Sequence, residues 1–289
     1  MNERNVKMTN DVSFVLVHGG WHSKDMWDKV VPLLSAAGFK THTLDLPGAG
    51  EYALEPASRR AVPFDPAAFA TEPSLNASVT QNERTEAVTD LVRKAAGHGG
   101  KIVLVGHSLG GITISPVAET VPELLHAAVY LSAFLIPPTF LPIAMMQNAS
   151  MAASISPSLF LADSKQVGAL RLNPTSLDAG YRARLKTAFY TDVDDKLLMS
   201  FVDKLHCDEP ASVFTVPSTV TPQRFGSVKR YYIRCAGDKA ITPEAQNFMI
   251  EAMDSAMPNQ TITYDLNTSH SPFLSQPQLL ADVLLKIAR

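Results

Sequence analysis

A serine with a glycine two residues away on either side stands at Ser108, the centre of the sequence GHSLG (residues 106–110). It follows the unbroken apolar run 102–105 and precedes a helix-compatible stretch, 112–119. This G-x-S-x-G pattern between a strand and a helix is typical of a nucleophile elbow, a sharp turn that flanking glycines permit and that presents the serine oxygen above a sheet. Ser108 is therefore the candidate nucleophile.

A serine hydroxyl becomes an effective nucleophile when a base takes its proton and a third group orients that base. Asp238 stands just after a predicted strand, and His270 stands just after the next one. The order serine, acid, histidine is the one that accompanies such an elbow, and open α/β sheets place their sites at the carboxyl ends of strands. We therefore expect Ser108, Asp238 and His270 to form a catalytic triad, although Asp238 could instead cap a helix beginning near Thr242.

Acyl transfer also needs two backbone N–H groups aimed at the oxygen on which negative charge develops. The residue after the nucleophile, Leu109, supplies one candidate amide. The loop HGGW (residues 18–21) supplies the other, because its glycines let the backbone approach a substrate closely. We expect the amides of Gly20 and Leu109 to form an oxyanion hole, with His18 and His107 supporting the geometry of the two loops.

Apolar runs alternate with helical patterns along much of the chain. Strands are predicted at residues 13–17, 40–46, 102–105, 127–133, 229–235 and 261–266, and helices at 27–37, 80–96 and 112–119. Thr80 and Glu83 match a capping box at the start of the second helix. Unbroken apolar strands that alternate with helices indicate a mostly parallel sheet covered on both faces. The fold class is therefore α/β.

Two stretches interrupt this alternation. Residues 50–77 contain four prolines and predict an irregular insertion near one end of the sheet. Residues 135–225 lose the strand signal and keep short helical patches such as 181–189, which predicts a helical cap inserted between core strands. The expected organisation is a core of residues 1–134 and 226–289 with a cap of residues 135–225.

Bulky side chains near these loops predict the substrate pocket. The candidates are Trp21, His22, Phe134, Phe140, Met145 and Met146. Aromatic rings and adaptable methionines suit an apolar acyl or alcohol pocket. An open alternative is that Phe134, Phe140, Met145 and Met146 only pack the cap onto the core.

Charge and composition limit the partners. The 289 residues include 25 Lys and Arg against 28 Asp and Glu, a net charge of −3 that gives no footprint for nucleic acid or an anionic membrane. No apolar run approaches a membrane span or a secretory segment, and two cysteines fit a reducing compartment. We expect a cytoplasmic protein whose partner is a small-molecule ester, and a homodimer is compatible with the sequence. Metal-ligand motifs are absent from the sequence, and the proposed chemistry needs no cofactor.

Taken together, these segments resemble the α/β-hydrolase superfamily, and within it the group of carboxylesterases, plant methylesterases and hydroxynitrile lyases. The resemblance rests, in chain order, on FVLVHGGWHSKDMWDKVVPLL, TLDLPGAG, VLVGHSLGG, GDKAITPEAQ and SHSPFLSQP. It implies an α/β-hydrolase fold, a mostly parallel central sheet flanked by helices. In the lyases a threonine follows the histidine of the first loop and a lysine follows the catalytic histidine, whereas Gly19 and Ser271 stand here, which favours ester hydrolysis.

The sequence thus predicts a serine carboxylesterase that hydrolyses an ester of a bulky, apolar small molecule through an acyl-enzyme on Ser108. One alternative is a cofactor-independent carbon–carbon lyase or dioxygenase, in which the His–Asp pair acts as a base and the serine is not acylated. Another is a non-catalytic ligand-binding member of the superfamily. Such members usually lack a triad residue, and here all three candidates are present.

Overall fold

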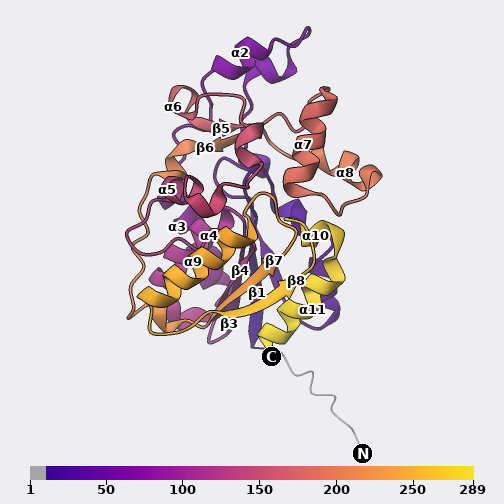
Figure 1. Cartoon of the computed structure of the whole chain (residues 1–289). Helices are drawn as coiled ribbons and strands as arrows, with labels where there is room; N and C mark the ends of the chain where they lie inside the picture. The colour runs from indigo at the N-terminus through magenta and orange to yellow at the C-terminus, as the bar shows by residue number, and fades with distance from the viewer. Residues whose placement is uncertain (1–10) are drawn as a thin grey trace, which may run out of the picture.

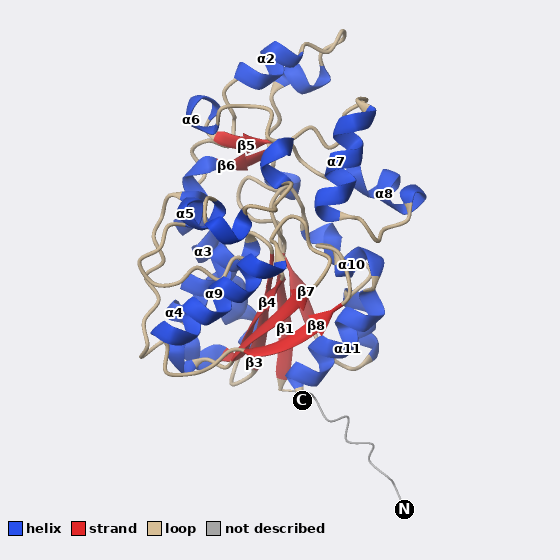
Figure 2. Cartoon of the chain, in the orientation of Figure 1, coloured by secondary structure: helices blue, strands red, loops and turns tan. Residues whose placement is uncertain are grey.

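A computed structural model describes residues 11–289, and its centre is a six-stranded sheet in the order β2-β1-β3-β4-β7-β8 (Figures 1 and 2). Every neighbouring pair of strands is parallel. The strands are β1 (Val12–Val17), β2 (Thr41–Thr43), β3 (Lys101–His107), β4 (Leu125–Leu131), β7 (Arg230–Cys235) and β8 (Ile262–Leu266). The α/β class and the mostly parallel sheet predicted from the sequence are confirmed.

Helices cover both faces of this sheet, which is why its central strands are almost entirely apolar (Figure 2). The helices of the sheet layers are α1 (Val31–Ala36), α3 (Gln81–Ala96), α4 (Gly110–Thr120), α9 (Pro243–Ala256), α10 (Pro272–Ser275) and α11 (Pro277–Ala288). Helices α3 and α4 pack together, and so do α1 and α11. This arrangement leaves the carboxyl ends of the strands free for loops.

The predicted capping box at the start of α3 is confirmed. The Thr80 hydroxyl accepts a hydrogen bond from the Glu83 N–H at 3.2 Å, and the Glu83 carboxylate accepts one from the Thr80 N–H at 2.7 Å. Two N–H groups that a helix start would leave unpaired are thereby satisfied. The expected helix 27–37 is shorter, because a 3-10 turn covers residues 24–27 and the α-helix begins only at Val31.

Residues 50–77 were expected to be irregular, and this expectation is wrong for one segment. Helix α2 (Pro66–Thr71) forms there, at the top of Figure 1. Pro66 is its first residue, where the missing proline N–H costs nothing, and the Asp65 carboxylate accepts from the Ala67 and Ala68 amides. The prolines therefore start a helix as well as interrupting regular structure.

Residues 135–225, here named the inserted segment, lie mostly beyond the carboxyl ends of the strands, and their last part runs back beside the sheet toward the start of β7 (Figure 1). They contain α5 (Pro142–Met146), α6 (Ser164–Val167), α7 (Ala179–Phe189) and α8 (Asp195–Val202). They also contain an antiparallel pair, β5 (Ala169–Arg171) and β6 (Asp208–Pro210), which was not expected. These strands are three residues long and carry a buried ion pair between Arg171 and Asp208, so they lack the apolar alternation by which strands are usually predicted.

Short 3-10 turns connect many of these elements. They are η1 (Lys24–Trp27), η2 (Gly50–Tyr52), η3 (Ala57–Arg60), η4 (Pro122–Leu124), η5 (Ala149–Met151), η6 (Ser156–Leu159), η7 (Ala211–Phe214) and η8 (Phe225–Ser227). Within residues 11–289, none of the helices has the length and apolar character needed to cross a membrane.

Candidate active site

Ser108 occupies the turn between β3 and α4 with φ +52°, a left-handed conformation that residues other than glycine rarely adopt. The glycines on either side are required by close approach. A Cβ at Gly106 would lie 2.9 Å from the carbonyl oxygen of Gly110, and a Cβ at Gly110 would lie 2.7 Å from that of His18. The strand, the helix and the first loop thus meet at the serine, as the elbow pattern predicts.

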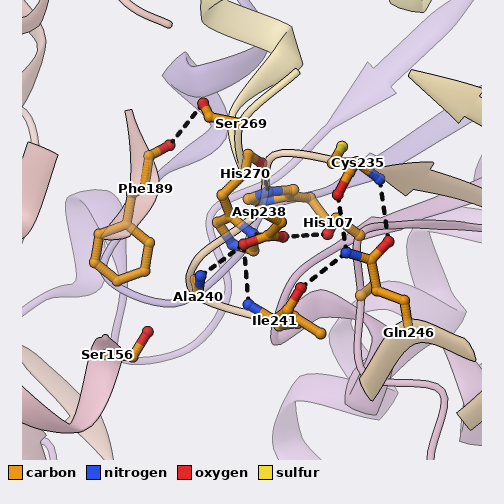
Figure 3. A network of polar contacts seen from close by, with 12 residues as sticks. His107, Ser156, Phe189, Cys235, Asp238, Ala240, Ile241, Gln246, Ser269 and His270 are labelled. Atoms are coloured by element: carbon orange, nitrogen blue, oxygen red, sulfur yellow. Dashed lines mark hydrogen bonds and ion pairs between the residues drawn. The ribbon is translucent and has the colours of Figure 1, made fainter. Parts of the chain in front are cut away.

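Asp238 lies in the loop after β7 and is fully buried. Its Oδ1 accepts hydrogen bonds from the N–H groups of Ala240 (2.7 Å) and Ile241 (3.0 Å), as Figure 3 shows. Its Oδ2 accepts from the Ser132 hydroxyl. Asp238 does not cap α9, because Thr242 performs that role with its own side chain. The carboxylate is therefore held in place for another partner.

That partner is His270, in the loop after β8, whose Nδ1 lies 2.5 Å from Asp238 Oδ2. A carboxylate only accepts, so Nδ1 carries the proton and Nε2 is left with a lone pair. The acid and histidine loops are joined by a hydrogen bond from the Gly237 N–H to the Thr268 carbonyl at 2.9 Å. His107, the neighbour of Ser108, donates from Nε2 to the His270 carbonyl at 2.9 Å. The elbow and the histidine loop are therefore in direct contact.

The first loop, HGGW, lies against the elbow. A Cβ at Gly19 would lie 2.9 Å from Ser108 Cβ, and one at Gly20 would overlap the Leu109 side chain. His18 holds the loop through Nδ1, which donates to the Gly19 carbonyl (2.8 Å), and through Nε2, which accepts from the Leu46 N–H (3.0 Å). The Gly20 backbone therefore lies against the Leu109 side chain, next to Ser108.

Trp21 ends this loop with φ +60°, and its N–H donates to the buried carboxylate of Glu209 at 3.1 Å. Glu209 belongs to β6 and forms an ion pair with Arg84 of α3. Burial alone would raise the pKa of Glu209, but Arg84 and His206 outweigh it and hold the pKa far below its usual range. An ionised carboxylate from the inserted segment therefore fixes the end of the loop.

Three further histidines surround the site and are buried as neutral groups. Burial lowers the pKa of His18 to about 4 and that of His22 to about 3. Burial, with His270 close by, also lowers the pKa of His107 well below its usual value. At neutral pH these rings act as hydrogen-bonding groups of fixed tautomer rather than as cations.

A small cavity of about 30 Å³ opens on Ser108. Its other lining residues are Trp21, Leu109, Phe134, Met146, Met151, Ser154, Ser156, Pro157, Phe160, Phe189, Ala240 and Ile241. Small-molecule sites usually enclose about 300–1,000 Å³. An ester can therefore enter only if some of these side chains move.

The structure brings half of the predicted pocket residues to this cavity. Trp21, Phe134 and Met146 line it. His22 lies behind the first loop, where its Nε2 accepts from the Tyr190 hydroxyl at 3.0 Å. Met145 is fully buried on the other side of α5, and Phe140 is 39% exposed at the surface. Neighbouring helical residues point in different directions, which separates Met145 from Met146.

The sequence reasoning missed several residues that meet at the site. They are Ser132, Asp192, Glu209, Phe160 and Phe189. All except Ser132 belong to the inserted segment, whose turns carry weak sequence patterns. Ser132 offered a signal, because it stands at the end of a predicted strand, where the other site residues also lie.

Comparison with known proteins identifies the family of this chain. The model of the alpha/beta hydrolase family matches residues 14–283. The chain therefore belongs to the alpha/beta hydrolase family, as the sequence motifs indicated.

Among curated proteins, the chain is similar to Salicylic acid-binding protein 2 of Nicotiana tabacum, with 30% identity over 95% of this chain and 96% of that protein. It is also similar to Methylesterase 1 of Arabidopsis thaliana, with 28% identity over 95% of both chains. Among solved structures, a pyrethroid hydrolase from Sphingobium faniae superposes with a TM-score of 0.70 at 23% identity and covers 96% of this chain and 97% of its own. This last likeness shows the shared fold.

Proposed function

We propose that this protein is a serine carboxylesterase that works through an acyl-enzyme on Ser108. The class itself follows from the family and the esterase relatives: the protein is a carboxylic ester hydrolase. The observation that carries the proposed route is the 2.5 Å contact between His270 Nδ1 and Asp238 Oδ2 beside the elbow. This contact supports His270 Nε2 as the base that would activate Ser108.

In the first half of the reaction, Ser108 Oγ forms a bond to the ester carbonyl carbon while its proton passes to His270 Nε2. Asp238 stabilises the imidazolium that results. The amides of Gly20 and Leu109 stabilise the negative charge on the carbonyl oxygen. The carbon–oxygen bond to the alcohol then breaks, and the alcohol leaves with the proton from His270.

In the second half, a water molecule attacks the acyl carbon and transfers a proton to His270. The bond from the acyl carbon to Ser108 Oγ breaks, the serine recovers its proton, and the carboxylic acid is released. Apart from the ester and this water, each step uses side chains and amides of this chain.

For the substrate, we propose an ester of a bulky, apolar small molecule. Apart from Ser108, Ser154 and Ser156, the cavity is lined by aromatic, aliphatic and methionine side chains. Met146 and Met151 are flexible, so their movement can enlarge the cavity without breaking a hydrogen bond. The inserted segment supplies most of these walls and acts, in this proposal, as a cap over the carboxyl edge of the sheet.

The test is labelling of Ser108 by a fluorophosphonate, followed by intact-mass spectrometry, alongside turnover of p-nitrophenyl esters of rising acyl length. We expect one adduct, located on Ser108, and faster turnover of longer acyl chains. Ser108→Ala should remove both the adduct and turnover while unfolding at the temperature of the unmodified protein.

A folded sample with neither adduct nor turnover would reject the acyl-enzyme route. The lyase or dioxygenase alternative would then be tested on ring substrates. Full turnover by Ser108→Ala would reject the assignment of the nucleophile.

A further inference from the structure

The connection between α7 and α8 lies against the loop that carries His270. The Asp192 carboxylate in this connection accepts hydrogen bonds from the Ser269 N–H (3.0 Å), the Ser269 hydroxyl and the Ser275 hydroxyl (2.9 Å). Ser269 directly precedes His270, and Ser275 ends α10. One carboxylate of the inserted segment therefore holds the backbone next to the candidate base.

Phe189, three residues before Asp192, reaches the same loop and also the cavity. Its carbonyl lies 3.3 Å from the Ser269 hydroxyl and shares that hydroxyl's single proton with Asp192 (Figure 3). Its ring centroid lies 5.6 Å from that of His270 and 6.1 Å from that of Trp21. The chain that tethers the histidine loop thus also forms one wall of the cavity.

Tyr190, the next residue, connects this chain to the first loop. Its hydroxyl donates to His22 Nε2 at 3.0 Å, and His22 Nδ1 donates to the Gly20 carbonyl at 2.7 Å. Residues 189–192 therefore contact the loops that hold both the candidate base and a candidate oxyanion amide.

We propose that Asp192 is a positioning residue that acts on His270 through Ser269 and couples the placement of the base to the closure of the inserted segment. This inference rests on the esterase function proposed above. The cavity of about 30 Å³ must widen to admit an ester, and Phe189, which forms one wall, contacts the same Ser269 that Asp192 holds. In this proposal the Asp192 bonds break when the cavity widens. They form again after the ester has entered, and the histidine loop then returns to the position seen in the structure.

Asp192 acts at a distance from the reacting atoms. It is exposed to solvent and does not line the cavity, and its carboxylate bonds to Ser269 and Ser275 rather than to the His270 ring. Asp238 already holds the His270 ring. Loss of Asp192 should therefore leave the triad assembled but its histidine loop less restrained.

The experiment measures kcat and KM for a p-nitrophenyl ester in Asp192→Ala and Asp192→Asn. We expect kcat to fall about tenfold or more in the alanine variant, because small displacements of a catalytic group lower the rate steeply, while KM changes less than about threefold. The asparagine variant should lose less, since its amide oxygen can still accept from the Ser269 N–H. Proton NMR adds a second readout: the low-field signal of the His270 Nδ1 proton should broaden or shift in the alanine variant.

Two further variants separate positioning from other effects. Asp195→Ala removes an acid of α8 that bonds to Lys186 instead of the histidine loop, and it should keep the kcat of the unmodified protein. Ser269→Ala should lower kcat. In the double variant, the fold loss in kcat should be much smaller than the product of the fold losses in the two single variants, because both changes break the same contact.

An unchanged kcat in Asp192→Ala, or a loss confined to KM, would overturn the inference. If Asp192→Ala does not fold, Asp192→Asn and Ser269→Ala decide the question, and an unchanged kcat in both overturns it. Labelling separates this failure from that of the proposed function. Labelling of Ser108 in the unmodified protein together with an unchanged kcat in Asp192→Ala rejects only the role of Asp192, whereas no labelling of the unmodified protein rejects the esterase route.

Discussion

Ser132 adds a fourth side chain to the candidate triad. It stands directly after β4 with φ +37°, is fully buried, and donates to the Asp238 oxygen that also bonds to His270. A left-handed conformation at a serine is costly, so the surrounding structure must hold this residue in place. The carboxylate therefore receives four hydrogen bonds, from Ser132, His270 and two amides.

Replacing Ser132 with alanine removes one of these donors. A hydrogen bond to a charged group contributes about 1.5–3 kcal/mol, so we expect kcat to fall about tenfold as the carboxylate becomes less fixed. Steady-state kinetics on a p-nitrophenyl ester measures the effect. Ser115→Ala is the matched control, because this buried serine bonds to Tyr130 and Gly111 away from the triad, and its kcat should stay the same. Equal kcat in both variants would remove Ser132 from the site.

Glu209 shows how one short strand of the inserted segment supports a loop of the core. Its carboxylate accepts from the Trp21 N–H and pairs with Arg84 inside the protein. We expect Glu209→Gln to lower the free energy of unfolding by about 3–5 kcal/mol, because it leaves the Arg84 charge buried without its partner. Urea unfolding measures this change. Replacing Glu209 and Arg84 together with methionine should recover part of the loss, and no recovery would argue against the ion-pair explanation.

The two methionines of α5 offer a matched pair for testing the pocket. Met146 lines the cavity, whereas Met145 is fully buried away from it. Met146→Ala should raise the preference for an octanoate over an acetate ester about tenfold, since each methylene that fits an apolar pocket is worth about 1–3 kcal/mol. Met145→Ala should lower stability by about 2–5 kcal/mol and leave this preference unchanged. The measurement is the ratio of kcat/KM for the octanoate ester to kcat/KM for the acetate ester in each variant. If this ratio is unchanged in Met146→Ala, the acyl chain does not bind beside Met146.

The buried neutral histidines set how the whole protein responds to acid. The pKa values of His18, His22 and His107 are lowered by burial, two of them to about 4 and about 3. In the unfolded chain the same groups titrate near 6.5, so the unfolded chain binds more protons once the pH falls below that value. Folding stability is therefore retained above about pH 6.5 and lost progressively as the pH falls toward the lowered pKa values.

We expect the free energy of unfolding to decrease below about pH 6.5 by up to about 1.4 kcal/mol per pH unit for each of these histidines. Urea midpoints between pH 7 and 4.5 measure the slope. His22→Phe removes one titrating group, so the unfolding free energy should fall less steeply with decreasing pH, by up to about 1.4 kcal/mol per pH unit. A slope identical to that of the unmodified protein would show that His22 does not contribute.

Much of this architecture could be predicted because each signal is local. An unbroken apolar run, a G-x-S-x-G turn and a capping box all lie within a few residues of the feature that they specify. The placement of Asp238 and His270 after strands then followed from the geometry of parallel sheets. Hence the order of strands and helices and the candidate triad could be stated without coordinates.

The contacts that complete the site could not be predicted in this way. Glu209 and Trp21 are 188 residues apart, and Asp192 and Ser269 are 77 residues apart. No short pattern reports such pairings, because they depend on how the inserted segment folds back over the sheet. Phe140 and Met145 illustrate the same limit: apolar type alone does not tell a wall of the cavity from a surface or core position.

The parallel pairing of β4 with β7 has a consequence for building chimeras with related enzymes. The inserted segment leaves the sheet at the carboxyl end of β4 but must rejoin it at the opposite end, where β7 begins. Residues 211–229 run from one end of the sheet to the other. The Glu119 carboxylate of α4 holds them in place, because it accepts hydrogen bonds from Thr221 and from the Phe225 N–H. A graft intended to exchange specificity should therefore end near residue 210 and keep the recipient's own descending chain, rather than run to the last residue before β7.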